Sequence, residues 1–419
     1  MRVLIPTAGC DLGRSGIGRF LQEMLAHLAE VAPWMHVTLA GTRKELAAFT
    51  TGSMSDEIVI DSRWEPPLAN VVWQQLGLPL AVARRRFDAA LLPAANRRAP
   101  LWLPCPTVGV VHDLAALRVP GKYDKVHEAY LRHVLPIALR QLSRLVTVSE
   151  SSRSDIASLA RVPAEQITVI PNGVDLRRMR PTPRSAAVLS LAPHIPVDRP
   201  YLLYVARVEH PGKNHMRLVD AFSRLKATTA LPHRLVLAGP QRERADEVRA
   251  YARASAAADA IVFTGYLPDH ALAALYSAAD ALIHPSLYEG FGIPLIEAMA
   301  CATPVACANT SSLPEIAGEA ALFFDPLDPE DMCATMIRLI RDEDLRERLI
   351  RAGRTRVRRF SWRESAARLA ALLEDAVTRR AAAGQETVTA TRNPSTPCRS
   401  FANPALPEPL RRHPRPQRP

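Results

Sequence analysis

Residues 281–300 read ALIHPSLYEGFGIPLIEAMA, and this stretch joins an apolar run, a glycine-containing turn and the beginning of a helix. The run Ala281–His284 is apolar up to its last residue, as in a strand whose two faces are both covered. Pro294 suits the first turn of a helix, where no backbone N–H donor is needed. The stretch therefore predicts one strand–turn–helix unit of a parallel α/β sheet.

The same unit recurs in two blocks of the chain, with helical periodicity between short apolar runs. Such alternation is typical of parallel, doubly wound sheets. The expected strands are 3–6, 37–40, 58–60, 89–92, 108–112, 145–148 and 168–170 in the first block, and 201–205, 234–238, 261–264, 281–284, 304–308 and 321–324 in the second. Prolines between positions 179 and 200 place a linker near 177–199.

These patterns predict two Rossmann-like α/β domains that face a cleft, with binding at the carboxyl ends of the strands. The first domain is expected over 1–177, completed by a helix over 361–380 that Ser361 caps, and the second over 200–360. The last segment, 384–419, contains eight prolines, six arginines and two glutamates. It has too little apolar surface to offset the entropy of ordering, so we expect it to be disordered.

Composition limits the class of protein. The chain has 419 residues, 48% hydrophobic and 23% charged, and no apolar run near the ~20 residues that cross a bilayer. Its first residues fit a buried strand better than a signal peptide. We expect a cytoplasmic protein whose six cysteines, which form no C-x-x-C pair, stay reduced. The net charge of +11 suits anionic partners: phosphates, nucleic acid or an acidic membrane surface.

Two glycine-containing turns are candidate binding sites. The first, GRSGIGR at 13–19, precedes a helix whose free N–H groups could hold a phosphate, although a plain turn explains it equally well. The second lies within 285–300, where Glu289 and Glu297 stand eight positions apart and flank the backbone around Phe291. A purely structural loop has little use for this second arrangement.

Two further features have ordinary explanations. Asp342-Glu343-Asp344 spells a D-x-D metal-binding pattern, but its polar, arginine-rich surroundings favour a helix start. His112 follows an apolar strand and would often be structural, yet its place at a strand end favours a role in the cleft.

Taken together, the motifs resemble those of the retaining family 4 glycosyltransferases of the GT-B type, in which two Rossmann-like domains face each other. The resemblance covers about residues 1–380 and includes the two-glutamate segment. The other matching segments are Gly16-Ile17-Gly18-Arg19, Val111-His112-Asp113-Leu114, Val148-Ser149-Glu150-Ser151-Ser152, Pro171-Asn172-Gly173-Val174-Asp175, Ala206-Arg207 and Gly212-Lys213-Asn214.

The resemblance implies a role for each matching residue. Glu289 would bind the donor sugar and His112 would contact it near the scissile bond, the two being the implied catalytic residues. Arg207 and Lys213 would neutralise the diphosphate. The other implied donor contacts are the ribose partner Glu297, the backbone N–H groups of Gly16, Phe291, Gly292 and Ile293, and the nucleobase turn with Tyr266 and Leu267. Two fixed cations would make a metal cofactor unnecessary.

The expected reaction moves a hexose from a nucleotide sugar to an acceptor. The segments at 16–19 and 112–114 look most like those of bacterial mannosyltransferases of surface polysaccharide synthesis, which implies GDP-mannose and an oligosaccharide or polyprenyl-linked acceptor. UDP-glucose is the second candidate donor. The sequence also leaves open a sugar-nucleotide epimerase or hydrolase on the same fold, or a nucleic-acid-binding protein. The absence of a nucleic-acid motif and an aromatic content of only 5% disfavour nucleic-acid binding.

Basic residues interleaved with apolar ones between Arg118 and Arg144 could dock on anionic lipid, although a solvated helix explains them equally well. The arginines at 84–86 and 97–98 add basic surface. Peripheral contact with the inner membrane face is therefore a further expectation.

Overall fold

The computed structural model describes residues 1–49, 55–121, 128–193, 195–196 and 198–392. Residues Met1–Val377 form one compact unit that holds two parallel sheets. All thirteen predicted strands are present. In the seven-stranded sheet they are β1 (Arg2–Pro6), β2 (His36–Thr42), β3 (Ser55–Ile60), β4 (Ala89–Leu92), β5 (Thr107–Val110), β6 (Arg144–Thr147) and β7 (Ile167–Val169), in the order β3-β2-β1-β4-β5-β6-β7.

The six-stranded sheet has the order β10-β9-β8-β11-β12-β13. Its strands are β8 (Tyr201–Val205), β9 (Arg234–Ala238), β10 (Ile261–Gly265), β11 (Ala281–His284), β12 (Val305–Ala308) and β13 (Ala321–Phe324). In both sheets the order reverses beside the first strand, between β1 and β4 and between β8 and β11. Ligands of doubly wound sheets bind at such switch points.

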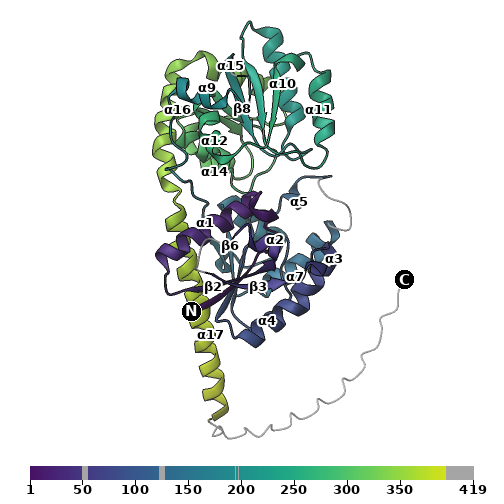
Figure 1. Cartoon of the computed structure of the whole chain (residues 1–419), viewed down its shortest axis with the longest axis vertical. Helices are drawn as coiled ribbons and strands as arrows, with labels where there is room; N and C mark the ends of the chain where they lie inside the picture. Colours follow the sequence, from purple (N-terminus) through teal and green to yellow (C-terminus); the bar gives the residue numbers. More distant parts are fainter. Residues whose placement is uncertain (50–54, 122–127, 194, 197, 393–419) are drawn as a thin grey trace, which may run out of the picture. The chain divides into compact units, whose positions relative to one another are not determined.

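Helices connect the strands of both sheets (Figure 1). Those of the first half are α1 (Gly16–Val31), α2 (Arg43–Leu46), α3 (Pro67–Val72), the π-helical η4 (Trp73–Gly77), α4 (Leu78–Arg85), α5 (Ala115–Arg118), the π-helical η5 (Tyr130–Val134), α7 (Leu135–Arg140) and α8 (Glu150–Leu159). Those of the second are α9 (Arg184–Leu191), α10 (His215–Thr228), α11 (Ala245–Ala254), α12 (Asp269–Ala278), α13 (Ile293–Ala300), α14 (Leu313–Ala317), α15 (Pro329–Arg341) and α16 (Glu343–Arg356), and α17 (Trp362–Arg392) ends the described chain.

Each sheet is buried on both faces, which is why its strands read as continuous apolar runs. Along β1, Val3 and Ile5 enter one apolar cluster and Leu4 enters another on the opposite face. The cluster with Val3 also contains Trp362 and Leu369 of α17, so the last helix packs on the first sheet. The second sheet and its helices form a separate cluster.

Two boundary predictions need correction. The linker near 177–199 contains the helix α9, because Ala187 and Leu191 pack into the core of the second sheet. The final helix extends to Arg392 instead of ending near 380, since the first proline beyond Gly384 is Pro394 and no earlier residue forbids helical backbone. The rest of the predicted disordered tail lies outside the described residues.

Two further sequence features can be located in the structure. The five described cysteines are buried, while Cys398 lies outside the described residues. Within the described part of the chain, no helix is both long and apolar enough to cross a bilayer.

Candidate functional site

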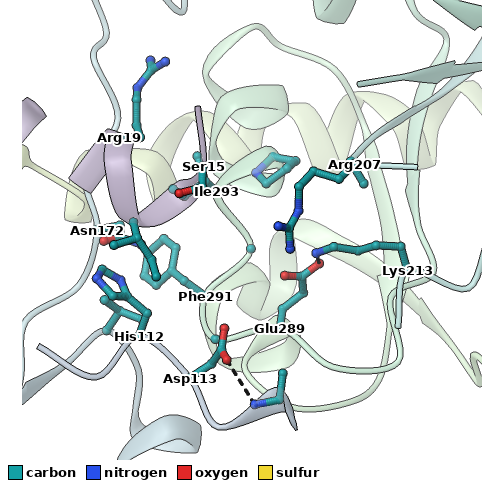
Figure 2. Close-up of a pocket in the computed structure, with 18 of the residues that line it drawn as sticks. Ser15, Arg19, His112, Asp113, Asn172, Arg207, Lys213, Glu289, Phe291 and Ile293 are labelled. Atoms are coloured by element: carbon teal, nitrogen blue, oxygen red, sulfur yellow. Dashed lines mark hydrogen bonds and ion pairs between the residues drawn. The ribbon is translucent and has the colours of Figure 1, made fainter. Parts of the chain in front are cut away.

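A cavity of about 600 Å³ is lined by residues from both halves of the compact unit. Its size is in the range of small-molecule sites. The first half contributes the beginning of α1 and the residues after β4 and β5, while the second contributes the residues after β8 and β11 (Figure 2). The cavity therefore lies at the carboxyl ends of the strands, where the sequence predicted it.

The N-terminus of α1 forms one wall of the cavity. Ser15 caps the helix and accepts a hydrogen bond from the Gly18 amide at 3.2 Å. A Cβ added at Gly18 would lie 2.5 Å from the Cys10 carbonyl oxygen, so close backbone packing requires glycine there. A Cβ at Gly16 would meet no protein atom within 4 Å. Gly16 thus leaves open space on the cavity side of a helix N-terminus, where an anion is favoured.

The turn between β11 and α13 forms the facing wall. Gly292 has a φ of 96° and stands directly before α13, a left-handed conformation that glycine adopts most easily. Gly290 lies against the other half, where an added Cβ would collide with the His112 carbonyl oxygen. The Gly290 carbonyl accepts hydrogen bonds from the Ser149 hydroxyl at 2.7 Å and the Ser152 hydroxyl at 3.3 Å. These contacts fix the turn between the two halves.

Glu289 is held by two basic side chains. Its Oε1 lies 2.6 Å from Lys213 Nζ and 3.1 Å from His284 Nε2. Burial acts to raise the pKa of Glu289, but the Lys213 charge and the His284 hydrogen bond outweigh it and hold the pKa well below its usual range. Its backbone N–H donates to the Ser311 hydroxyl at 2.9 Å. Glu289 is therefore an oriented, ionised carboxylate at the cavity wall.

Arg207 and Lys213 bring positive charge to the same wall. Arg207 follows β8 and its Nη2 lies 3.2 Å from Glu209 Oε2, with the side chain still 31% exposed. Lys213 directly precedes Asn214, whose side-chain amide donates to the carbonyls of Pro285 and Pro326. Figure 2 shows the Arg207 guanidinium and the Lys213 ammonium beside the Glu289 carboxylate. A diphosphate in the cavity would find both cations in place.

His112 is neutral and oriented. Its Nε2 lies 2.9 Å from the Pro93 carbonyl oxygen, which can only accept, so Nε2 carries the proton and Nδ1 keeps a lone pair. Burial lowers the pKa of His112 from 6.5 to about 4. Phe20 packs edge-on against the ring, with centroids 4.9 Å apart. The ring can accept a hydrogen bond from a ligand hydroxyl, but it carries no charge at neutral pH.

Nine of the eleven predicted site residues line the cavity. They are Gly16, His112, Arg207, Lys213, Tyr266, Glu289, Phe291, Gly292 and Ile293. Leu267 and Glu297 do not belong to the lining. The Leu267 side chain is buried in the second core, and the Glu297 carboxylate accepts a hydrogen bond from the Tyr276 hydroxyl at 2.8 Å. Helical rotation from the end of the turn carries Glu297 toward α12.

Two of the cavity-lining residues that the sequence did not assign, Tyr288 and Arg97, have partners far away in sequence. Tyr288 donates to Asp155 Oδ2 at 2.5 Å, while Arg118 also binds this buried carboxylate. Arg97, interpreted only as basic surface, lines the cavity and pairs with Asp11 at 2.8 Å. An aromatic residue next to Glu289 and an arginine soon after a strand end were the available signals. Neither reveals a partner that is distant in sequence.

The D-x-D pattern has a structural role that confirms its interpretation as a helix start. Asp342 caps α16, and its carboxylate accepts a hydrogen bond from the Leu345 amide at 2.9 Å. Among the described residues, no group of three or more His, Cys, Asp or Glu side chains is arranged to hold a metal ion.

Comparisons with known proteins match both halves. Residues 14–178 match the family described as Glycosyltransferase Family 4, and residues 191–356 match Glycosyl transferases group 1. The O-antigen chain mannosyltransferase B of Escherichia coli is 28% identical over 383 residues, which are 86% of this chain and 96% of that protein. The MMP alpha-(1->4)-mannosyltransferase of Mycolicibacterium hassiacum is 34% identical over 251 residues, 58% of this chain and 56% of its own length.

Solved structures share the fold. HepE of Anabaena, solved in complex with UDP and glucose, has a TM-score of 0.71 at 19% identity and covers 90% of this chain and 100% of its own. Sucrose-phosphate synthase of Thermosynechococcus elongatus has a TM-score of 0.71 at 20% identity, covering 90% and 98%. At these identities the likeness concerns the arrangement of the two sheets.

Proposed function

Because this chain belongs to the family 4 glycosyltransferases of the GT-B type, we propose that it transfers mannose from GDP-mannose, with retention, to a lipid-linked oligosaccharide of a surface polysaccharide. That it is a hexosyltransferase follows from its family; donor, acceptor and stereochemistry are the proposal. The observation that carries it is one cavity in which Arg207 and Lys213 stand beside the ionised carboxylate of Glu289.

Departure of a nucleoside diphosphate concentrates negative charge on its terminal phosphate. Preorganised cations stabilise that charge most where water is excluded. Arg207 can bind two phosphate oxygens at once, and Lys213 acts as a point charge. The N-termini of α1 and α13 both line the cavity through Gly16 and Ile293, and their dipoles add to the same field. With this charge supplied by the chain, we propose that transfer needs no metal ion.

Glu289 and His112 would bind the sugar. Glu289 accepts hydrogen bonds from sugar hydroxyls, and the free lone pair of His112 Nδ1 accepts another. Both are held before the donor arrives, so they can fix the sugar in a reactive pose without reorganising.

Retention fits the carboxylates available. Of the described residues that line the cavity, Asp113 and Glu289 carry carboxylates, and each already has a partner. Asp113 Oδ1 accepts from the Ala115 amide at 3.1 Å, and Glu289 pairs with Lys213. We propose that these contacts hold both carboxylates in binding roles and that neither acts as a covalent nucleophile. We therefore propose attack by the acceptor on the face from which the diphosphate leaves, through an oxocarbenium-like state.

The acceptor proposal is supported by the relatives: the Escherichia coli protein that matches most of this chain is named for the O-antigen chain. We propose that the enzyme works in the cytoplasm at the inner membrane face, where its described cysteines, all of them buried, stay reduced.

The test is to incubate the full chain with labelled GDP-mannose or UDP-glucose, with and without polyprenyl-linked oligosaccharide, in EDTA and in MgCl₂. We expect label in the lipid fraction from GDP-mannose, with equal rates in both buffers and an axial anomeric bond by NMR. Transfer only from UDP-glucose would show that UDP-glucose, and not GDP-mannose, is the donor. Conversion of the donor without acceptor would favour an epimerase or hydrolase. Activity that EDTA abolishes would refute the metal-independent proposal.

A further inference from the structure

An apolar ridge runs along the outer face of the helices between β3 and β4. Leu68, Val72, Leu76 and Leu80 follow at intervals of four residues, which places them on one face. All four are exposed, Leu68 to 84% and Leu76 to 69%. The inner face is formed by other residues, since Leu78 and Val82 are buried in the core. The ridge (Leu68, Val72, Leu76 and Leu80) is therefore not needed for packing of the first half.

A loop adds an aromatic side chain beside the ridge. The Gln75 side chain accepts from the Leu101 amide at 2.9 Å and donates to the Ala99 carbonyl at 3.2 Å, which fastens the loop to η4. Trp102 follows and is 66% exposed. An exposed tryptophan next to aliphatic side chains is typical of surfaces that enter a membrane interface.

The segment that carries the ridge is basic at its C-terminal end and is flanked by the exposed acidic residues Glu65 and Asp88. Residues 66–87 contain the three arginines at 84–86 and no aspartate or glutamate. All three arginines are exposed at the end of α4. A symmetric contact with a second copy would place the arginines of one copy close to those of the other, and like charges repel. Complementarity instead favours an anionic, apolar partner, and a membrane of anionic lipid offers both properties over an extended area.

The ridge is directly connected to the cavity. Asn96 and Arg97 line the cavity wall, and the next residue, Arg98, donates from Nε to Asn70 Oδ1 on α3 at 3.1 Å. One short segment therefore begins at the cavity and ends at Trp102 beside the ridge. A surface docked on the ridge would lie next to the part of the cavity that the first half forms.

The stretch between Arg118 and Arg144, predicted as the membrane surface, is less suitable. Leu131, Leu135 and Leu139 are buried in the same core that Leu78 joins. Among its described residues, Val134 and Ile137 are the large apolar side chains left exposed. The helical periodicity of the stretch therefore reflects packing into the core. Residues 122–127 lie outside the described chain. Figure 1 shows α3, α4 and α7 on the same side of the first sheet.

We propose that the ridge, Trp102 and the arginines at 84–86 dock the protein on an anionic lipid surface and deliver a lipid-anchored acceptor to the cavity wall at Asn96 and Arg97. The docking rests on this surface alone, while the delivery of an acceptor rests on the proposed function. The apolar side chains enter the interface and the arginines neutralise headgroups.

The test is sedimentation of the full chain with vesicles of phosphatidylcholine alone or mixed with phosphatidylglycerol. We expect binding to the mixed vesicles only, weakened by salt. Replacing all three arginines (Arg84→Ser, Arg85→Ser, Arg86→Ser) should lower the partition coefficient roughly 100-fold, since each basic residue near such a surface contributes a factor of about five. Leu76→Glu and Trp102→Glu should each reduce binding at least tenfold. Leu189→Glu, at an exposed leucine of α9, is the matched control and should bind normally.

Circular dichroism and thermal melts should match wild type for every variant, because the side chains are exposed. Transfer to a water-soluble acceptor should also be unchanged, while transfer to acceptor in mixed vesicles should fall with binding. Equal vesicle binding by all variants would overturn the docking. The docking would also be overturned if the wild-type protein did not bind vesicles and instead formed a concentration-dependent dimer by light scattering. In that case Leu76→Glu would dissociate the dimer. If no donor is turned over at all, the proposed function fails, yet the vesicle result still decides the docking.

Discussion

The Lys213 ammonium lies 2.6 Å from the Glu289 carboxylate, although 76 positions separate the two residues in sequence. Both side chains are largely buried, exposed to 14% and 15% respectively. Each residue follows a strand of the second sheet, and parallel strands bring their carboxyl ends to one edge. The pair joins the cation that we propose for the diphosphate to the carboxylate that we propose for the sugar.

Glu289→Gln should lower kcat about 100- to 1000-fold, because an amide lacks the charge that stabilises a positive sugar in the transition state. The initial rate of labelled sugar transfer under saturating donor measures this. Glu247→Gln is the matched control, since Glu247 also pairs with a basic residue, Arg244, but on an exposed helix. A Glu289→Gln enzyme with the wild-type rate would show that the carboxylate is misassigned.

Lys213→Met should weaken donor binding and also destabilise the fold by about 2 kcal/mol, since it leaves Glu289 without its cation in a mostly buried site. Calorimetric titration with the donor and guanidinium unfolding measure the two effects. The double variant Lys213→Met/Glu289→Gln should recover most of the stability yet remain inactive. Equal stability of the single and double variants would contradict a coupled pair.

Gly16→Val should fold normally but bind donor at least tenfold more weakly, because its side chain would enter the open cavity and meet only ligand. Gly18→Ala is the contrasting change. Its Cβ would collide with the Cys10 carbonyl, so it should lower the melting temperature by several degrees. If Gly16→Val bound the donor with wild-type affinity, the N-terminus of α1 would not contact the donor.

Stability should decline as the pH falls from about 6.5 to about 4. Burial lowers the pKa of His112 from 6.5 to about 4, so over this range the unfolded chain binds a proton that the folded protein excludes. The effect of this histidine amounts to about 3 kcal/mol over the whole interval. His112→Gln should reduce the slope of unfolding free energy against pH, measured by denaturant titration. Burial also lowers the pKa of His215 and His284, so part of the slope should remain.

Tyr288→Phe should cost about 1–2 kcal/mol of stability, because Asp155 loses a hydrogen bond but keeps Arg118. The same change loosens the turn that carries Glu289, so KM for the donor should rise. Tyr251→Phe removes a comparable hydroxyl–carboxylate contact, with Asp220, at an exposed site and serves as control. Identical melting of wild type and Tyr288→Phe would mean that this contact does not hold the turn.

The sequence by itself determined the thirteen strands and the family. Strands covered on both faces must be apolar throughout, so each one is visible as a short run such as Tyr201–Val205. The glycines and glutamates of the turn after β11 are also local features, because a left-handed backbone or a helix N-terminus needs particular residues at fixed spacing. Together with the family resemblance, such local features suffice to identify nine residues of the cavity.

Only the tertiary structure decided which side chains meet. The resemblance implied that Glu297 binds the ribose of the donor, but its carboxylate accepts a hydrogen bond from Tyr276 and does not line the cavity, whereas Arg97 does. Leu76 and Leu78 are equally apolar in sequence, yet one is exposed on the ridge and the other is buried in the core. Whether a side chain is buried, and which partner it has, depends on packing between segments far apart in the chain. A local sequence pattern does not indicate which segment will lie opposite.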